Sequence, residues 1–247
     1  MKLGETRIHV ESCESTQTLL DPSMAEGTVA VADVQTAGRG RLGRTWEAPP
    51  RSAVLVSVLL RPSADRPLPQ LALVAGVAVA DALEELTGLS VQIKWPNDVM
   101  LRRTKVAGIL AEARESAVVV GIGVNVNQTR EQLPNRGGSL RTATGLEWDR
   151  DAVLDAVLGA LGTRYEQWRV GGLDAVYDGL ERGWSYKRIR NAAESVCSEL
   201  NSRVLGLRDL YNQCVSEAVS SGVTQVANPN LSNFHRSKGK SAVLASN

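Results

Sequence analysis

The sequence predicts an α+β fold in which helices pack on one mixed, mostly antiparallel β-sheet. Several short runs of Val, Ile, Leu and Ala follow one another between residues 91 and 126, with only tight turns between them. Two longer segments, one before and one after that region, carry apolar residues at helical spacing. The regular alternation of strand and helix that is typical of parallel sheets is not seen.

Seven strands are expected, each a short run of apolar or β-branched residues. They occupy residues 6–10, 29–35, 53–60, 91–94, 99–101, 106–112 and 117–126. The run at 53–60 is apolar except at Ser57, which is typical of a central strand buried on both faces. We interpret 117–126 as an edge strand that would pair across a two-fold axis if the protein forms a homodimer.

Two long helices are expected. Pro69 suits the first position of a helix that continues to about residue 86. Its apolar face carries Leu71, Val74, Ala78, Ala82 and Leu86. The second helix, residues 150–169, has an apolar stripe of Val153, Leu154, Val157, Leu161 and Trp168. Near the N-terminus, Ser15 and Thr16 suit a helix N-cap, but Pro22 and Gly27 limit that helix to a turn or two.

The composition of the chain changes near its C-terminal end. Residues 185–247 contain 18 Ser or Asn in 63 residues, against 13 in the preceding 184. Segments 189–200 and 203–219 have loose helical periodicity, whereas 220–247 is polar and predicted to be disordered. We therefore expect two domains, residues 5–175 and an atypical C-terminal segment at 176–247.

The overall composition excludes several classes of protein. A net charge of +1 argues against broad, non-specific nucleic-acid binding, which needs a strongly basic face. Three cysteines without a Cys-x-x-Cys pair suit a reducing compartment better than a disulfide framework or a zinc site. The first residues lack the apolar core of a signal peptide, and the longest apolar run, residues 71–80, is too short to cross a bilayer. A cytoplasmic protein without membrane contact is expected.

A glycine- and arginine-rich segment is the first candidate ligand site. Between residues 36 and 51 stand four Arg and one Glu. Glycines let backbone N–H groups approach an anion, and guanidinium groups bind phosphate or carboxylate oxygens in pairs. The alternative is a solvated surface loop. The pattern Gly38-x-Gly40-x-x-Gly43 also matches a dinucleotide fingerprint, but Pro49 and Pro50 prevent the helix that this fingerprint must open.

Three further segments are ambiguous when taken singly. Lys-Trp-Pro-Asn-Asp at 94–98 presents a cation, an amide and a carboxylate, or is simply a β-turn. Lys105 enters a small-residue strand where a ligand could lie, or is a solvated edge charge. The glycines in Gly-Ile-Gly-Val-Asn-Val-Asn at 121–127 leave room above a sheet, or the asparagines cap a turn.

Together and in this order, these segments resemble the catalytic domain of biotin–protein ligases, the biotin–[acetyl-CoA-carboxylase] ligases of the BirA type. The resemblance covers about residues 6–172 and rests on segments 14–17, 35–46, 94–99, 105–110 and 121–126. It implies a fold like that of class II aminoacyl-tRNA synthetases and biotin ligases, with the biotin- and ATP-binding catalytic domain at 5–175. Relatives end in a small β-barrel, and the pattern of that barrel is not found in residues 176–247.

The resemblance also implies an activity. Such enzymes join biotin to ATP as biotinyl-5′-AMP, with Mg²⁺, and pass the biotinyl group to one lysine of a biotin carboxyl carrier domain of a carboxylase. DNA binding is not expected, because no winged-helix segment precedes residue 6. A lipoate ligase of the same fold, or a binder of biotin or its adenylate without turnover, are the alternatives.

Site residues follow from the same resemblance. The residues implied for biotin are Ser15, Thr16, Gln17, Gln35, Gly38, Arg39, Gly40, Arg41, Lys105 and Gly108. The residues implied for ATP are Arg41, Arg44, Trp46, Lys94, Asn97 and Asn125, with Trp46 as a stacking surface for adenine. Catalytic roles fall to Arg41, Lys105 and Asp98, and the metal ligands stay unassigned. Residues 38–46 are expected to be mobile in the empty enzyme and to close on the ligand.

Overall fold

A computed structural model of the chain describes residues 1–63, 66–94, 96–115 and 117–176. The segments 189–200, 203–219 and 220–247, for which helical periodicity or disorder is predicted, lie outside the described residues. So does nearly all of the atypical segment that is expected in place of a β-barrel.

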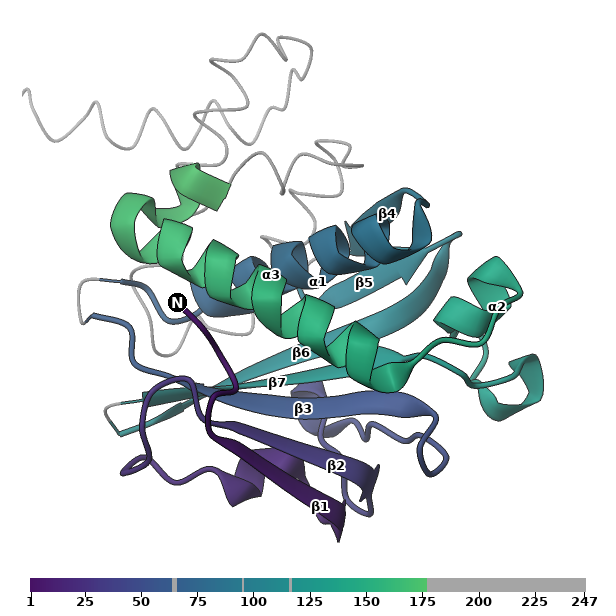
Figure 1. The fold of residues 1–247 in the computed structure, drawn as a ribbon, viewed down its shortest axis with the longest axis horizontal. Coiled ribbons are helices and arrows are strands. Elements are labelled where there is room, and N and C mark those ends of the chain that lie inside the picture. Colours follow the sequence, from purple (N-terminus) through teal and green to yellow (C-terminus); the bar gives the residue numbers. More distant parts are fainter. Residues whose placement is uncertain (64–65, 95, 116, 177–247) are drawn as a thin grey trace, which may run out of the picture. The chain divides into compact units, whose positions relative to one another are not determined.

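One mixed sheet of seven strands forms the described part of the chain (Figure 1). Its strands are β1 (Arg7–Cys13), β2 (Val29–Gln35), β3 (Ala53–Leu60), β4 (Val91–Lys94), β5 (Asp98–Leu101), β6 (Thr104–Arg114) and β7 (Ala117–Asn125). Their order is β1-β2-β3-β7-β6-β5-β4, and only the β1–β2 pair is parallel. The predicted fold class is therefore confirmed.

The position of each strand follows from its side chains. All eight residues of β3 are buried, and β3 lies in the interior of the sheet as its apolar run predicts. β1 alternates between exposed and partly buried residues and lies at one edge. β7 was expected at an edge, and this expectation is wrong, because β7 lies between β3 and β6. Its backbone groups are engaged on both sides, so β7 has no free edge for pairing with a second copy of the chain.

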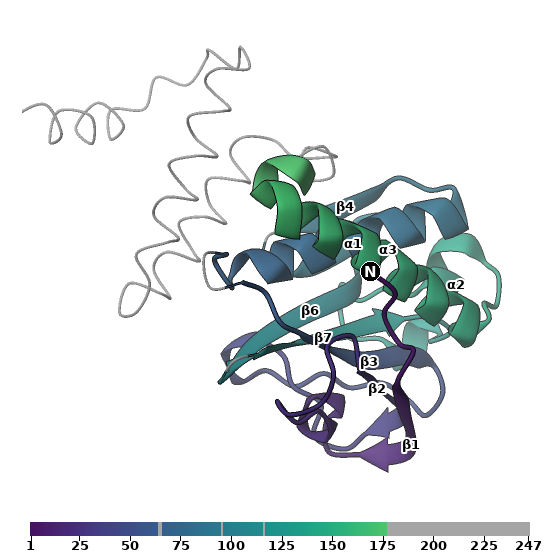
Figure 2. The ribbon, with the colours of Figure 1, turned by 60° about the vertical axis from the view of Figure 1, so that its left-hand side comes forward.

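Two long helices cover one face of the sheet (Figures 1 and 2). Helix α1 (Gln70–Thr87) follows Pro69 directly and packs against α3 (Arg150–Gly171). The predicted stripe of α3 is buried throughout, whereas in α1 Leu86 is only partly buried. A side-chain hydrogen bond also joins the two helices to each other, since the Trp168 indole of α3 donates to Gln70 Oε1 of α1 at 2.7 Å. Among the described helices, none has the length and apolar character that crossing a bilayer requires.

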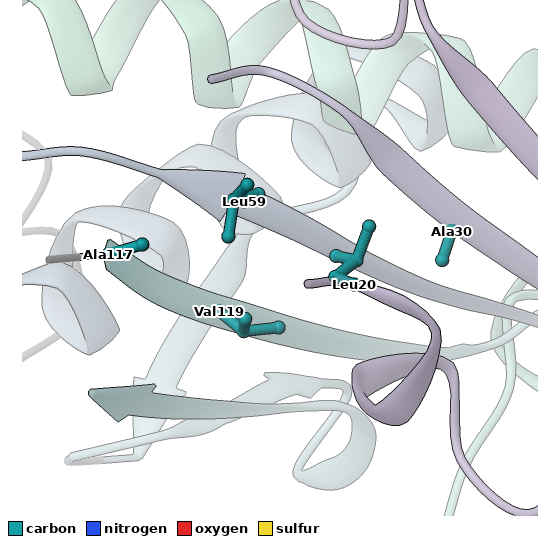
Figure 3. Close-up of a cluster of buried hydrophobic side chains, with 5 residues drawn as sticks. All are labelled: Leu20, Ala30, Leu59, Ala117 and Val119. Carbon is teal, nitrogen blue, oxygen red and sulfur yellow. The ribbon is translucent and has the colours of Figure 1, made fainter. Parts of the chain in front are cut away.

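The opposite face of the sheet carries a short 3₁₀ helix, η1 (Thr16–Leu19), where the sequence predicts a turn or two of helix. Beside it a small cluster of buried apolar side chains packs on the sheet (Figure 3). The cluster consists of Leu20, Ala30, Leu59, Ala117 and Val119. Residues alternate between the two faces of a strand, so Gly121 and Gly123 lie on the same face as Val119. A glycine-lined floor therefore continues from this cluster toward the end of β7.

Candidate functional site

A cavity of about 140 Å³ lies on the sheet face that carries η1. Twelve of the sixteen predicted site residues line it: Ser15, Gln17, Gln35, Arg39, Gly40, Arg41, Arg44, Trp46, Asn97, Asp98, Lys105 and Gly108. They come from segments far apart in the sequence, and the fold brings them together. Thr16, Gly38, Lys94 and Asn125 do not line this cavity.

A second, larger hollow adjoins the first. This groove of about 970 Å³ includes Lys94 and Asn125 among its lining residues. Five residues line both spaces: Arg44, Thr45, Trp46, Asp98 and Lys105. The two spaces are thus separated by a shared wall that carries a lysine, a carboxylate and an indole.

The glycine- and arginine-rich loop folds into a small hairpin over the cavity. Trp46 N donates to Gly38 O at 2.8 Å, and Gly40 N donates to Arg44 O at 2.7 Å. Leu42 lies at the tip with φ 59°, a left-handed conformation that is costly for leucine, and its side chain is exposed. Like-charged arginines therefore stand side by side on a short loop whose backbone is held by its own hydrogen bonds.

Arginine side chains fasten this loop to the sheet. Arg39 Nη2 lies 2.8 Å from Glu112 Oε2 and 3.1 Å from Gln17 Oε1. Arg41 Nη1 donates to Asn97 Oδ1 at 2.9 Å. Sequence reasoning missed Glu112. The one signal available was its even spacing from Gly108 along β6, which places both on the same face of the strand.

The Trp46 indole lies flat on a pair of glycines. Gly108 and Gly123 are direct cross-strand partners on β6 and β7. A Cβ added at Gly123 would lie 2.4 Å from Trp46 Cε2, and one at Gly108 would lie 2.8 Å from Trp46 Cζ3. Gly108 was predicted to let the ligand lie close to the strand. In the structure the space above it is filled by Trp46, whose buried Nε1 has no hydrogen-bond partner among the described residues.

Lys105 reaches the same face through an irregularity in the sheet. Lys105 and Gly108 are three residues apart, so in a regular strand their side chains would point to opposite faces. The β5–β6 register shifts between Val99 and Met100, and Val106 is the extra residue of this bulge. As a result Lys105 Nζ lies 2.7 Å from Asp98 Oδ1 and 5.4 Å from the centre of the Trp46 ring.

The polar groups at the η1 end of the cavity hold one another in place. Gln35 Oε1 accepts from Thr16 N at 2.7 Å and from Thr16 Oγ1 at 3.0 Å. Thr16 Oγ1 also lies 2.7 Å from Ser57 Oγ, a residue that sequence reasoning did not assign to the site. Thr16 is buried behind Gln35, so it orients Gln35, while Ser15 and Gln35 line the cavity.

Asn125 is engaged within the protein. Its Nδ2 donates to Gly138 O at 2.9 Å, and its Oδ1 accepts from Gln128 Nε2 at 2.9 Å. Gly138 N in turn donates to Lys105 O at 2.8 Å. Asn125 thus fastens the segment 128–139 beside Lys105. Its predicted role as a ligand of ATP stays a prediction.

The charges of the site suit an anion better than a protein-held metal ion. No group of three or more His, Cys, Asp or Glu that could hold a metal occurs in the described part of the chain. The carboxylates along the second groove are Glu47, Asp98 and Glu131, and Asp98 already pairs with Lys105. Mg²⁺ commonly binds proteins through one or two carboxylates and the phosphates of its substrate. These residues fit a cation that arrives with a polyphosphate.

Comparison with known proteins gives consistent results. Residues 10–128 match the biotin/lipoate A/B protein ligase family. A bifunctional ligase/repressor BirA of Bacillus subtilis is 38% identical over 190 residues, which are 70% of this chain and 58% of that protein. A biotin–[acetyl-CoA-carboxylase] ligase of Mycobacterium tuberculosis is 40% identical over 150 residues, 58% of this chain and 56% of that protein. The chain therefore spans less than two thirds of these curated relatives.

A solved structure extends the match. The biotin protein ligase from Aquifex aeolicus in complex with biotin and ATP is 37% identical, with a TM-score of 0.67. The match covers 74% of this chain and 79% of that protein.

Proposed function

Because the chain belongs to the biotin–protein ligase family, we propose that it activates biotin with ATP and transfers the biotinyl group to a lysine of a biotin carboxyl carrier domain. The observation that carries this proposal is the shared wall of the two cavities. A ligase of this kind needs one enclosed site for an acid and one open, basic groove for a nucleotide. It also needs a cation where the acid meets the α-phosphate, and Lys105, which lines both cavities, is our candidate for that cation.

The smaller cavity suits the head group of biotin. Ser15 and Gln35 line its inner end, and Thr16 orients Gln35 from behind. A buried urea must have its donors and acceptors paired, since each unpaired group costs about 1–3 kcal/mol. Arg39, Gly40 and Arg41 cover the outer part, so the valeryl chain of biotin would run beneath the loop toward Lys105.

The first half-reaction needs no nucleophilic side chain. A carboxylate oxygen of biotin attacks the α-phosphorus of ATP in line, and the bond from that phosphorus to the bridging oxygen of the β-phosphate breaks as pyrophosphate leaves. Lys105, Arg41 and Arg44 hold the reacting oxygens and offset their charge, at about 1.5–3 kcal/mol for each charged hydrogen bond. Mg²⁺, when bound with ATP, adds to this neutralisation of phosphate charge.

The second half-reaction brings an amine to the same point. The uncharged acceptor lysine attacks the carbonyl carbon of biotinyl-5′-AMP, an amide bond forms, and AMP leaves with the phosphate oxygen. The amine must first lose a proton, and Asp98 is the carboxylate placed to attract and orient it. Because the mixed anhydride is labile, the loop 38–46 would shield it from water until the carrier docks.

Biotin-dependent ATP–pyrophosphate exchange, measured with Mg²⁺ beside biotin transfer to a carrier domain, tests the proposal. Exchange together with transfer is the expected result. Exchange without transfer would place this chain among adenylate formers that do not complete the reaction. Exchange with lipoate but not with biotin, or no exchange at all, would refute the proposal.

A further inference from the structure

The second groove carries more positive charge than the predicted ATP residues account for. Its lining contains the cations Arg44, Lys94, Arg103, Lys105 and Arg136 against the carboxylates Glu47, Asp98 and Glu131, which is five against three, or +2. Lys105 and Asp98 neutralise each other at 2.7 Å. Glu131 is exposed and turned to Thr129, whose hydrogen bond lowers the pKa of Glu131. Arg103 and Arg136 belong to none of the predicted site residues.

Arg103 occupies a turn that ordinary turn chemistry does not explain. β5 and β6 are joined by two residues, Arg102 and Arg103, because Leu101 pairs with Thr104. Both have left-handed backbones, with φ 46° and φ 68°. Two-residue turns of this kind strongly prefer Asn and Gly, because side chains with a Cβ are strained there. Arg103 lines the second groove, whereas Arg102 does not.

Arg136 is held in the same way from the opposite wall of the groove. Its φ is 66°, again left-handed. Its carbonyl accepts from Lys105 N at 3.0 Å, and Arg130 Nη2 donates to Pro134 O at 2.8 Å within the same segment. With the Asn125–Gly138 hydrogen bond, these contacts fix the strained conformation of 128–139 beside Lys105. Arg103 and Arg136 therefore approach Lys105 from two separate segments of backbone.

Neither guanidinium group has an ion pair or hydrogen bond to another described residue, and both residues are exposed at the groove. Two such arginines that line one groove together with Arg44 and Lys94 point to a multiply charged anion. Arg103 and Arg136 line only the second groove, whereas Lys105 lines both spaces, so an anion that meets all three extends from the shared wall into the second groove.

We propose that Arg103 and Arg136 bind the terminal phosphates of ATP and then the pyrophosphate that leaves. This inference rests on the proposed function, since it assigns part of the nucleotide groove to one portion of the substrate. It makes both arginines specificity residues for a nucleoside triphosphate over a monophosphate. They lie beyond the reacting phosphorus, so they are not expected to contact biotin or the acceptor lysine.

The test uses the full chain and the variants Arg103→Gly and Arg136→Gly in the exchange assay. Each is expected to raise the KM for ATP and the KM for pyrophosphate about tenfold, the effect of losing one charged hydrogen bond. The KM for biotin and inhibition by AMP should not change, because neither ligand carries terminal phosphates. Tm should stay the same or rise, because glycine relieves the left-handed strain.

Arg102→Asn is the matched control. It lies in the same turn with the same strain and the same charge, but it does not line the groove. It should leave the KM for ATP unchanged. An unchanged KM for ATP in both groove variants would overturn the inference. So would an equal loss in Arg102→Asn, or a fall in Tm that accompanies the loss of affinity. If the unaltered chain shows no exchange at all, the proposed function fails instead, and the two failures are distinct.

Discussion

Adding one methyl group beneath Trp46 tests how the floor of the site is built. In Gly123→Ala the new Cβ would lie 2.4 Å from Trp46 Cε2, 2.7 Å from Cζ2 and 2.8 Å from Nε1. Carbon atoms in contact prefer a separation of about 3.5–4.0 Å, so the indole must retreat by about 1 Å. It can move only away from the sheet, into the space beside Lys105 that both cavities share.

The cost can be estimated from this geometry. Forcing an extra methyl group into a packed contact typically costs about 1–3 kcal/mol. For a protein of this size each kcal/mol lowers Tm by about 2–4 °C. Gly159→Ala is a control of opposite sign, since nothing lies within 4 Å of a Cβ at this position inside α3. That change should stabilise the protein by about 0.5–1 kcal/mol, because alanine favours a helix more than glycine does.

Thermal unfolding and exchange kinetics of four proteins measure the effect: the unaltered chain, Gly123→Ala, Trp46→Ala and the double variant. Gly123→Ala should lower Tm and lower kcat/KM at least tenfold, because the displaced indole would occupy space in which biotin and ATP meet. In the Trp46→Ala background the same change should cost almost nothing, since the clash is gone. An equal penalty in both backgrounds would refute the seating of Trp46 on the Gly108–Gly123 pair.

Three further predictions concern the loop and the β2–α3 contact. Glu112→Gln should weaken the contact of that side chain with the Arg39 guanidinium, now 2.8 Å away, and raise the KM for biotin about three- to tenfold. Glu147→Gln is the control: it weakens an exposed ion pair with Arg141 outside both cavities and should leave the KM for biotin unchanged. If both variants behave alike, the Glu112 contact has no role in the site. Arg41→Gly should release free adenylate that labels bystander lysines without carrier, and unchanged carrier-free labelling would contradict the shielding role of the loop. Burial disfavours the charge of Asp33, but the hydrogen bonds and charges of Arg150 and Arg51 outweigh it and hold the pKa of Asp33 below its usual range. The stabilisation by ionised Asp33 is therefore complete above the unfolded-state pKa of about 3.9 and is lost as pH falls through the lower folded-state pKa. Urea unfolding from pH 6 down to pH 3 should show a smaller loss of stability in Asp33→Asn than in the unaltered chain, and parallel curves would contradict this.

Limited proteolysis tests whether residues 38–46 are mobile in the empty enzyme and close on the ligands. The side-chain contacts of Arg39 with Gln17 and Glu112, and of Arg41 with Asn97, hold the loop in this structure, and the Arg39–Glu112 contact is exposed to solvent. We expect cleavage after the arginines of this loop to slow when biotin and ATP are added together. Equal rates of cleavage with and without the ligands would show that no closure occurs.

Much of the fold could be predicted from local sequence. The bounds of β2, β3 and β4 agree with the predicted runs to the residue, and α1 and α3 begin within one residue of the expected positions. Such elements are predictable because the burial of each side chain repeats with the period of its own strand or helix. The chemical character of the site was also readable, since its glycines, arginines and lysines are grouped in short segments.

Other features were decided only by contacts between distant segments. The interior position of β7 depends on its pairing with β3 and β6, because the sequence of an apolar strand is similar at several positions of a sheet. The bulge at Val106, which turns Lys105 toward Asp98, arises from the register of β5 against β6 and has no local signature. Glu112 belongs to the site only because Arg39, 73 residues earlier, reaches it. Sequence alone thus determined which groups the protein has, and the tertiary structure decided which of them meet, because sheet register and side-chain contacts link residues that no local pattern relates.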